Sequence, residues 1–284
     1  MSWKDVLVLV ADARIDEPAI ALAEEVARRF EAQLCATFLT PLPDEPLAYE
    51  PTVVAGVWAE LLGRARAQSE AERAKVAARI SAAAPKCELK IAEALSRDLG
   101  RVAALHARYA DIAVLARSPE SDHGDLRDEI VEGVLFHSGR PALVAPPNWP
   151  GGNSSKSVGK RILVAWDASR EATRALADAS PFIDTADSVA IVTVDAKPKM
   201  FGHGDTPGAK IAAHLTRRGA KVEVRNIESK SKPVSLALMD EARALNADLI
   251  VMGGYSSSRL REMVFGGATR DLLRTAEAPL LMSH

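Results

Sequence analysis

The second half of the chain alternates short apolar runs with segments of helical periodicity. The apolar runs predict five strands, at 162–166, 189–194, 221–227, 248–252 and 279–282. The intervening segments predict helices at roughly 169–182, 207–218, 233–245 and 267–275. The central runs are apolar at consecutive positions, which is typical of parallel strands that helices cover on both faces. This β-α alternation predicts a doubly wound α/β domain.

The first half repeats these features in the same order, which indicates a duplicated domain. KDVLVLVADARIDEPAIALA from Lys4 resembles KRILVAWDASREATRALA from Lys160, and ADIAVLARS from Ala110 resembles ADLIVMGGYS from Ala247. GRPALVAPP then resembles EAPLLMSH at the two ends. The offset falls from 156 to 137 between the first two matches, so the first half holds 19 more residues. We expect them in the helical, Ala-, Glu- and Arg-rich pattern at 52–84.

The segment NWPGGNSSKSVG at 148–159 separates the two halves and has the composition of a linker. We therefore predict domains at 1–147 and 160–284. Each is expected to hold a doubly wound, mainly parallel, five-stranded sheet of Rossmann-like topology. Sheets of this kind bind ligands at the carboxyl ends of their strands, near the point where the strand order reverses. The loops after the first and fourth strands of each domain are thus the candidate sites.

In the second half these loops contain an acid and two glycine pairs. Asp167 follows the first strand, where it either forms a turn or lies near a bound nucleoside. Gly253 ends the fourth strand, and Gly266-Gly267 precede Thr269 at the start of a helix. Glycines at these places either serve turns or let the backbone approach a ligand, and free amides at a helix start attract anions. The residue pattern alone leaves both interpretations open.

Nearly the whole chain resembles a tandem universal stress protein. The features that carry the resemblance are ILVAWDAS with Asp167, the strand VTVD, the strand ADLIVMGG, and the last strand after Ala278-Pro279. Nucleotide-binding members of that family carry G-x2-G-x9-G-[ST], followed by a further hydroxyl. Gly253 and Gly266 match the first and third glycines, and Thr269 matches the later hydroxyl. The two departures are Ser256 in place of the second glycine and Gly267 in place of Ser or Thr.

The resemblance implies a stress-response protein that binds an adenine nucleotide, ATP or ADP with or without Mg²⁺, in its C-terminal domain as a regulatory ligand. The implied site consists of Asp167 and Val194 at the adenine, Gly253 at the ribose, Ser256 in the loop, and Gly266, Gly267 and Thr269 at the phosphates. The departure at Gly267 removes one hydroxyl hydrogen bond, worth about 0.5–1.5 kcal/mol. The resemblance also implies that the last strands of the two domains, PALVAP and PLLMSH, pair within the chain as a pseudo-dimer.

The first half lacks the motif. Ala116-Arg117 replace the first glycine pair, and the acids Asp128 and Glu129 stand where phosphates would bind, so we predict no nucleotide in the family manner there. Ala11 aligns with Asp167. An alternative function is a nucleotide-free interaction protein, or a carrier of an apolar ligand, acting through this domain. The additional segment would then supply a pocket, or else pack in the core, with Val53, Val54, Val57, Trp58, Leu61 and Leu62.

Charge, apolar run length and cysteine content narrow the possible partners and cellular location. A net charge of −2 does not indicate a nucleic-acid partner or an acidic membrane surface, and no apolar run reaches the length of a membrane span. Cys35 and Cys87 are interpreted as buried free thiols in a reducing compartment, so we expect a cytoplasmic protein. The expected partners are an adenine nucleotide and an unidentified protein, with a dimer of chains as a further assembly beyond the intramolecular pseudo-dimer.

The sequence offers little sign of catalysis. The six histidines form no metal-binding pattern, and neither a P-loop nor a G-x-S-x-G motif is present. A general base paired with a charge-stabilising group is not evident either. We therefore predict neither a metal site nor catalytic residues, and at most slow ATP hydrolysis.

Overall fold

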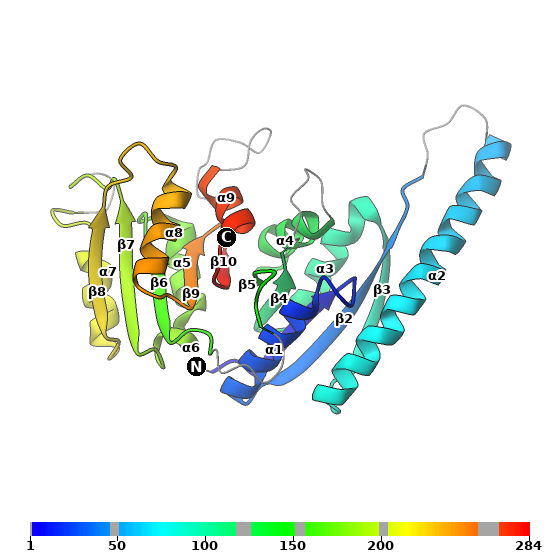
Figure 1. Cartoon of the computed structure of the whole chain (residues 1–284), viewed down its shortest axis with the longest axis horizontal. Helices are drawn as coiled ribbons and strands as arrows, with labels where there is room; N and C mark the ends of the chain where they lie inside the picture. The colour runs from blue at the N-terminus through cyan, green and yellow to red at the C-terminus, as the bar shows by residue number, and fades with distance from the viewer. Residues whose placement is uncertain (1, 46–50, 118–125, 151–156, 199–203, 255–266) are drawn as a thin grey trace. The chain divides into compact units, whose positions relative to one another are not determined.

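The computed structural model describes residues 2–45, 51–117, 126–150, 157–198, 204–254 and 267–284 (Figure 1). Contacts divide the chain into two compact units. One unit is Lys4–Arg140, here called the first unit. The other, the second unit, is Pro141–His284 together with Met1–Trp3. Both are α/β folds built mainly from parallel strands, as the sequence predicts.

In the first unit the strands lie in the order β3-β2-β1-β4, and every described pair among them is parallel. The elements in chain order are β1 (Asp5–Val10), α1 (Glu17–Phe30), β2 (Gln33–Leu42), α2 (Pro51–Ala83), β3 (Leu89–Leu95), the short 3₁₀ helix Ser96–Asp98, α3 (Leu99–Ala107), β4 (Ile112–Ala116) and α4 (Leu126–His137). The strand β1 is central and apolar, and its residues from Val6 to Val10 are buried.

The additional segment of the first half is the long helix α2, as predicted (Figure 1). Near its C-terminal end, Val76 and Ile80 are fully buried. Nearer its start, Val57 and Leu61 are 53% and 43% exposed. The expectation that these two side chains pack in the core is therefore wrong, while their lining of an apolar pocket stays a prediction. Helical spacing predicts the helix itself, but which of its turns are covered depends on where the sheet ends.

In the second unit the strands lie in the order β5-β10-β9-β6-β7-β8. The elements in chain order are β5 (Ala142–Ala145), β6 (Arg161–Ala165), α5 (Arg170–Asp178), α6 (Ser180–Ile183), β7 (Ser188–Val194), α7 (Ala209–Arg217), β8 (Val222–Ile227), α8 (Val234–Ala244), β9 (Leu249–Gly253), α9 (Gly267–Thr275) and β10 (Leu280–Ser283). The predicted pairing of the two final strands is observed, because β5 runs antiparallel to β10 with Leu143 opposite Leu281.

The helix predicted over 169–182 is interrupted. It forms two helices, α5 and α6, that separate at Ala179, and Pro181 lies in the first turn of α6. Proline has no amide hydrogen and its ring clashes with the preceding turn, so it starts a helix more easily than it continues one. The remaining predicted strands and helices of this half agree with the structure to within about two residues, as expected at element ends.

A repeated carboxylate supports the duplication. Asp111 accepts hydrogen bonds from the amides of Lys4 and Asp5, at 2.6 and 3.0 Å. In the second unit Asp248 accepts from Lys160 and Arg161, at 2.8 and 3.0 Å. The two acids are 137 residues apart and the two lysines 156, so the same offsets found in the sequence recur in the structure. Each acid therefore anchors the amino end of its central strand.

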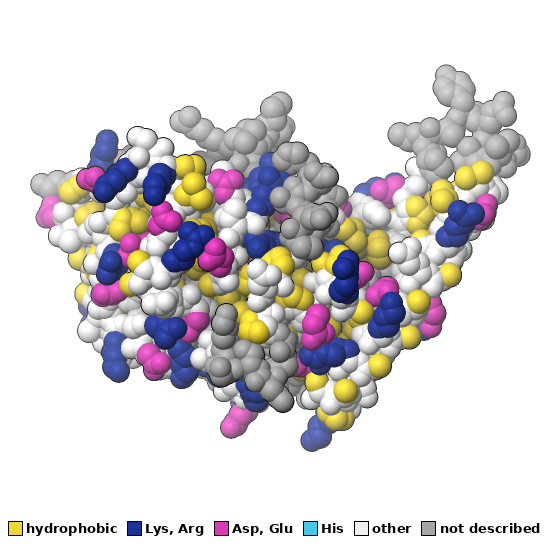
Figure 2. All heavy atoms as spheres, in the orientation of Figure 1, with side chains coloured by type: hydrophobic (Ala, Val, Ile, Leu, Met, Phe, Trp, Pro, Cys, Tyr) yellow, Lys and Arg dark blue, Asp and Glu magenta, His cyan; other side chains and the backbone are white. Residues whose placement is uncertain are grey.

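The surface charge and the burial of the two cysteines bear on the predicted partners and on thiol reactivity. Basic and acidic side chains are interspersed on the face drawn in Figure 2, in keeping with the net charge of −2. Among the described residues, we find no helix with the length and apolarity that a membrane crossing requires. Cys35 and Cys87 are free and half-buried rather than fully buried. Burial raises the pKa of the Cys87 thiol to about 11, which disfavours its reactive thiolate.

Candidate functional site

The carboxyl ends of β6, β7 and β9 bring three predicted site residues to one edge of the second sheet. The strand β6 lies between β9 and β7, so the strand order reverses beside it. Ala165 is in register with Val192 and with Met252. Continuing that register sets Asp167 beside Val194 and Trp166 beside Gly253. Neighbouring strands are about 5 Å apart, so the loop after β6 lies between the two other strand ends.

Asp167 shapes the turn that follows β6. Its exposed carboxylate accepts a hydrogen bond from the amide of Ser169, Oδ1 to N, at 3.0 Å. Ala168 between them has a φ of 61°. Ser169 caps α5, since its Oγ accepts from the amide of Ala172 at 3.0 Å. The structure thus supports the turn-forming role of Asp167, while contact with adenine stays a prediction.

Gly253 is a glycine for a packing reason that needs no ligand. A Cβ atom on it would lie 2.5 Å from the backbone nitrogen of Ala172 and 2.7 Å from the carbonyl carbon of Glu171. The first turn of α5 therefore packs directly on the end of β9. Of the two interpretations of this glycine, close packing inside the protein is the one that the described geometry demonstrates.

Two polar residues at this edge were not foreseen. Glu171, in the first turn of α5, is 9% exposed and pairs with Arg170, Oε1 to Nε, at 3.2 Å. Ser283, the last residue of β10, is in register with Gly253 and 2% exposed. Within the described part of the chain, its Oγ is buried and has no hydrogen-bond partner.

The helix α9 follows β9 in the chain, after residues that lie outside the described part of the structure. Gly267 is its first residue and is exposed, and a Cβ atom there would meet no atom of the described residues within 4 Å. Thr269, one position further into the first turn than Ala268, is 6% exposed. Amides at a helix start carry partial positive charge and attract anions. The predicted site residues Ser256 and Gly266 lie outside the described residues.

The corresponding edge of the first unit is filled by an ion pair that the sequence does not reveal. Arg127, at the start of α4, donates from Nε to Asp16 Oδ1 at 2.9 Å, and their side chains are 11% and 4% exposed. Burial raises the pKa of Asp16, although Arg127 and two backbone amides oppose that rise. Repulsion by Asp128 and Glu129 is thus an incomplete account of why this half would reject phosphates.

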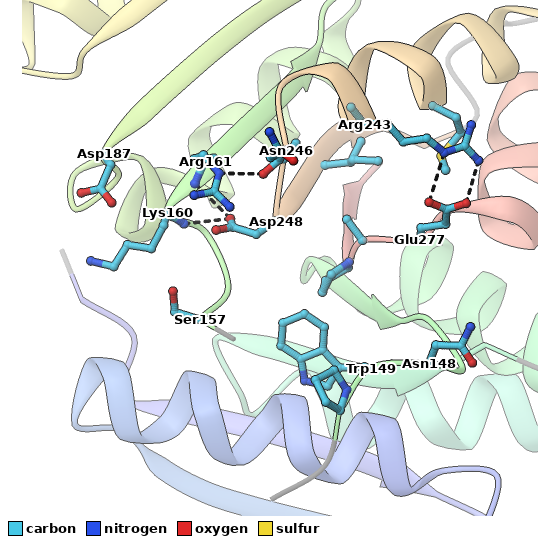
Figure 3. Close-up of a pocket in the computed structure, with 17 residues that line it drawn as sticks. Asn148, Trp149, Ser157, Lys160, Arg161, Asp187, Arg243, Asn246, Asp248 and Glu277 are labelled. Atoms are coloured by element: carbon cyan, nitrogen blue, oxygen red, sulfur yellow. Dashed lines mark hydrogen bonds and ion pairs between the residues drawn. The ribbon is translucent and has the colours of Figure 1, made fainter. Parts of the chain in front are cut away.

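A larger cavity, of about 740 Å³, lies at the amino ends of the strands in the second unit. Figure 3 shows that two of its charged side chains, Arg243 and Glu277, face each other. Arg243 donates to both carboxylate oxygens of Glu277, at 2.6 and 3.1 Å, and Arg161 donates to the carbonyl of Asn246 at 2.7 Å. These pairs hold helix and strand ends together, so the cavity is the weaker candidate for an anionic ligand.

A metal centre has no support in the described residues, because no group of three or more His, Cys, Asp or Glu side chains there is arranged to hold an ion. Any Mg²⁺ at the carboxyl edge would have to be bound largely through phosphate oxygens, as Mg²⁺ commonly is.

Comparison with known proteins shows which family and which solved structures the chain is similar to. Residues 159–284 match the model of the universal stress protein family. A search of curated protein sequences found no match. A universal stress protein from Archaeoglobus fulgidus has a similar structure, with a TM-score of 0.66 at 17% identity, over 98% of this chain and 95% of its own. A functionally unknown protein from Pseudomonas aeruginosa gives a TM-score of 0.55 at 14% identity, over 99% of this chain and 92% of its own.

At such identities the structural likeness demonstrates the fold, whereas the family match rests on sequence. The two findings agree, since the matched residues coincide with the half that kept the glycine motif. Residues 159–284 therefore form a domain of the universal stress protein family, and the chain as a whole has the fold of a universal stress protein.

Proposed function

We propose that the second unit binds an adenine nucleotide, ATP or ADP, at the carboxyl edge of its sheet, and that the protein acts in a stress response under the control of this ligand. The observation that carries the proposal is the family match over residues 159–284, together with the strand edge that brings Asp167, Val194 and Gly253 together. A cytoplasmic location and an unidentified protein partner belong to the same proposal.

Different residues would contact the adenine, the ribose and the phosphates. Asp167 and Val194 would contact the adenine, and Gly253 would lie at the ribose. Glu171 packs against Gly253 through its Cβ and backbone, and its negative charge disfavours phosphates at this strand end, because like charges repel. The phosphates would therefore lie at Gly267 and Thr269, together with Ser256 and Gly266. Mg²⁺ would bind to the phosphates.

The proposal is tested on the purified full-length protein. We expect denaturation to release an adenine nucleotide that mass spectrometry identifies, and calorimetric titration of nucleotide-free protein to show saturable binding of ATP or ADP. Binding that cannot be detected in protein shown to be folded by circular dichroism would contradict the proposal. Product release during the same titration would reveal hydrolysis, which we expect to be slow at most.

Replacing Gly267 with serine is expected to tighten nucleotide binding. The family motif has Ser or Thr here, and the position has room for a side chain, since a Cβ would meet nothing within 4 Å. One added hydrogen bond contributes about 0.5–1.5 kcal/mol, or roughly a 2- to 10-fold lower Kd. Calorimetric titration measures the change. Gly267→Ala is the matched control, because it fills the same space without a hydroxyl and should leave the Kd near that of the wild type.

The alternative function is a nucleotide-free interaction protein or a carrier of an apolar ligand that acts through the first unit. It is favoured by the exposed Val57 and Leu61 on α2. The nucleotide titration separates the two proposals. If the folded protein binds no nucleotide, and Val57→Ser/Leu61→Ser abolishes capture of a fluorescent apolar probe, the alternative is supported instead.

A further inference from the structure

The loop between β1 and α1 has an unusual arrangement of hydrogen bonds. Every backbone amide from residue 11 to residue 16 donates to an oxygen of the same unit. The acceptors are Asp16 Oδ2 for Ala11 and Asp12 at 2.7 and 2.8 Å, Glu72 Oε2 for Ala13 at 3.1 Å, Asp12 Oδ1 for Arg14 and Ile15 at 2.9 and 2.8 Å, and Asp12 O for Asp16 at 3.1 Å. Successive amides in a turn form a concave site that prefers anions.

Asp16 lies in this loop as a bound anion would. One of its carboxylate oxygens accepts from the amides of Ala11 and Asp12, and the other accepts from Arg127. The side chain is 4% exposed. The cavity that remains beside it, lined by Leu9, Leu115 and Ile130 among others, measures about 10 Å³. That volume admits one water molecule at most.

The second unit lacks this feature. With the offset of 156 residues that relates the first strands, Ala172 occupies the position equivalent to Asp16. Its loop instead relies on Asp167 and Ser169, which bond to amides only two or three residues away. In the first unit the long helix α2 is also held against α1, because Arg79 of α2 forms ion pairs with both Glu17 and Glu24 of α1.

We propose that the loop 11–16 and Arg127 form a binding site for a carboxylate-sized anion, which the chain fills with its own Asp16, so that only the second unit offers a strand-end site to a soluble nucleotide. That only the second unit offers a site to a nucleotide rests on the proposed function. The occupation of the loop by Asp16 does not, since it depends on contacts inside the first unit alone.

The test removes the internal anion and supplies an external one. In Asp16→Gly, sodium formate is expected to protect the amides of Ala11 and Asp12 from hydrogen exchange in a saturable manner, whereas sodium chloride at the same ionic strength is not. The variant should unfold at a temperature lower by roughly 10 °C, because one partner of a buried ion pair is lost. Formate should recover about half of that loss once it exceeds its Kd roughly thirty-fold.

Two control variants should show no response to formate. Asp16→Asn keeps the shape of the side chain and leaves no room, so formate should have no effect beyond that of chloride. Glu72→Gln neutralises the α2 carboxylate that accepts from the amide of Ala13, removes no atoms next to Ala11 and Asp12, and should likewise give no formate response. Equal exchange of the Ala11 and Asp12 amides in formate and in chloride, in folded Asp16→Gly, would overturn the proposal.

If Asp16→Gly is recovered only unfolded, the yield on refolding provides the same test. The yield must rise with formate relative to chloride, and equal yields would overturn the proposal. Nucleotide stoichiometry checks the remaining clause on the wild-type chain. One nucleotide per chain is expected, and two would overturn the clause. None would contradict the proposed function of the second unit and would leave the formate result for Asp16 intact.

Discussion

Replacing Gly133 with alanine is expected to destabilise the protein more than the same substitution at any other described helical glycine. Gly133 of α4 faces Gly100 of α3, and a Cβ atom on Gly133 would lie 2.2 Å from the carbonyl oxygen of Gly100. That contact is with backbone, so no rotamer change relieves it and the two helices must separate. Overpacking usually costs about 1–3 kcal/mol, and we expect about 3 kcal/mol or more here.

Urea denaturation followed by far-ultraviolet circular dichroism measures this loss. Gly63→Ala is the matched control, since Gly63 lies in the helix α2 and an added Cβ would meet nothing within 4 Å. Alanine is the better helix former, so the control should be more stable by about 0.5–1 kcal/mol. Equal shifts for the two variants would show that helix propensity, rather than the contact between α3 and α4, controls the result.

Replacing Gly253 with alanine is expected to destabilise the second unit by about 2–3 kcal/mol, because the added Cβ would meet the first turn of α5. The loss is measured by urea denaturation, with Gly267→Ala as the control at an open position. We also expect weaker nucleotide binding, since α5 and the loop at Asp167 must move away from β9. A Gly253→Ala protein as stable as the wild type would contradict the packing seen here.

This expectation changes how the nucleotide site should be examined. The first glycine of the family motif has a packing role in this chain, so its substitution cannot separate binding from folding. Gly267 has no such role, because the space around it is open. Substitutions at Gly267 therefore report on the ligand more directly than those at Gly253.

Several features could be predicted from sequence because they depend on neighbours along the chain. Apolar runs and helical spacing predict the strands of the second half to within about two residues, and the helix at 267–275 coincides with α9. The repeated segments predict the duplication, and the surplus of 19 residues points to α2. Pro181 carried a signal for the break between α5 and α6 that periodicity alone obscures.

The composition of the two strand edges could not be predicted in this way. Asp16 and Arg127 are 111 residues apart, and only the placement of β4 beside β1 brings the helix that follows it to the loop after β1. Ser283 meets Gly253 because β10 lies beside β9, and Glu171 is buried because α5 packs against that same strand end. Periodicity reports which face of an element is apolar, but not which element lies opposite.

The pairing of the last strands was implied by the family resemblance. By itself, then, the sequence determined the duplicated α/β design and the half that retains a family motif. Those properties follow from local periodicity and from similarity between segments, both of which are linear. Tertiary structure alone decided that Gly253 is enclosed by α5 and that the first unit's loop is occupied by Asp16. The physical reason is that burial and ion pairing depend on distances across the sheet, which the order of residues does not contain.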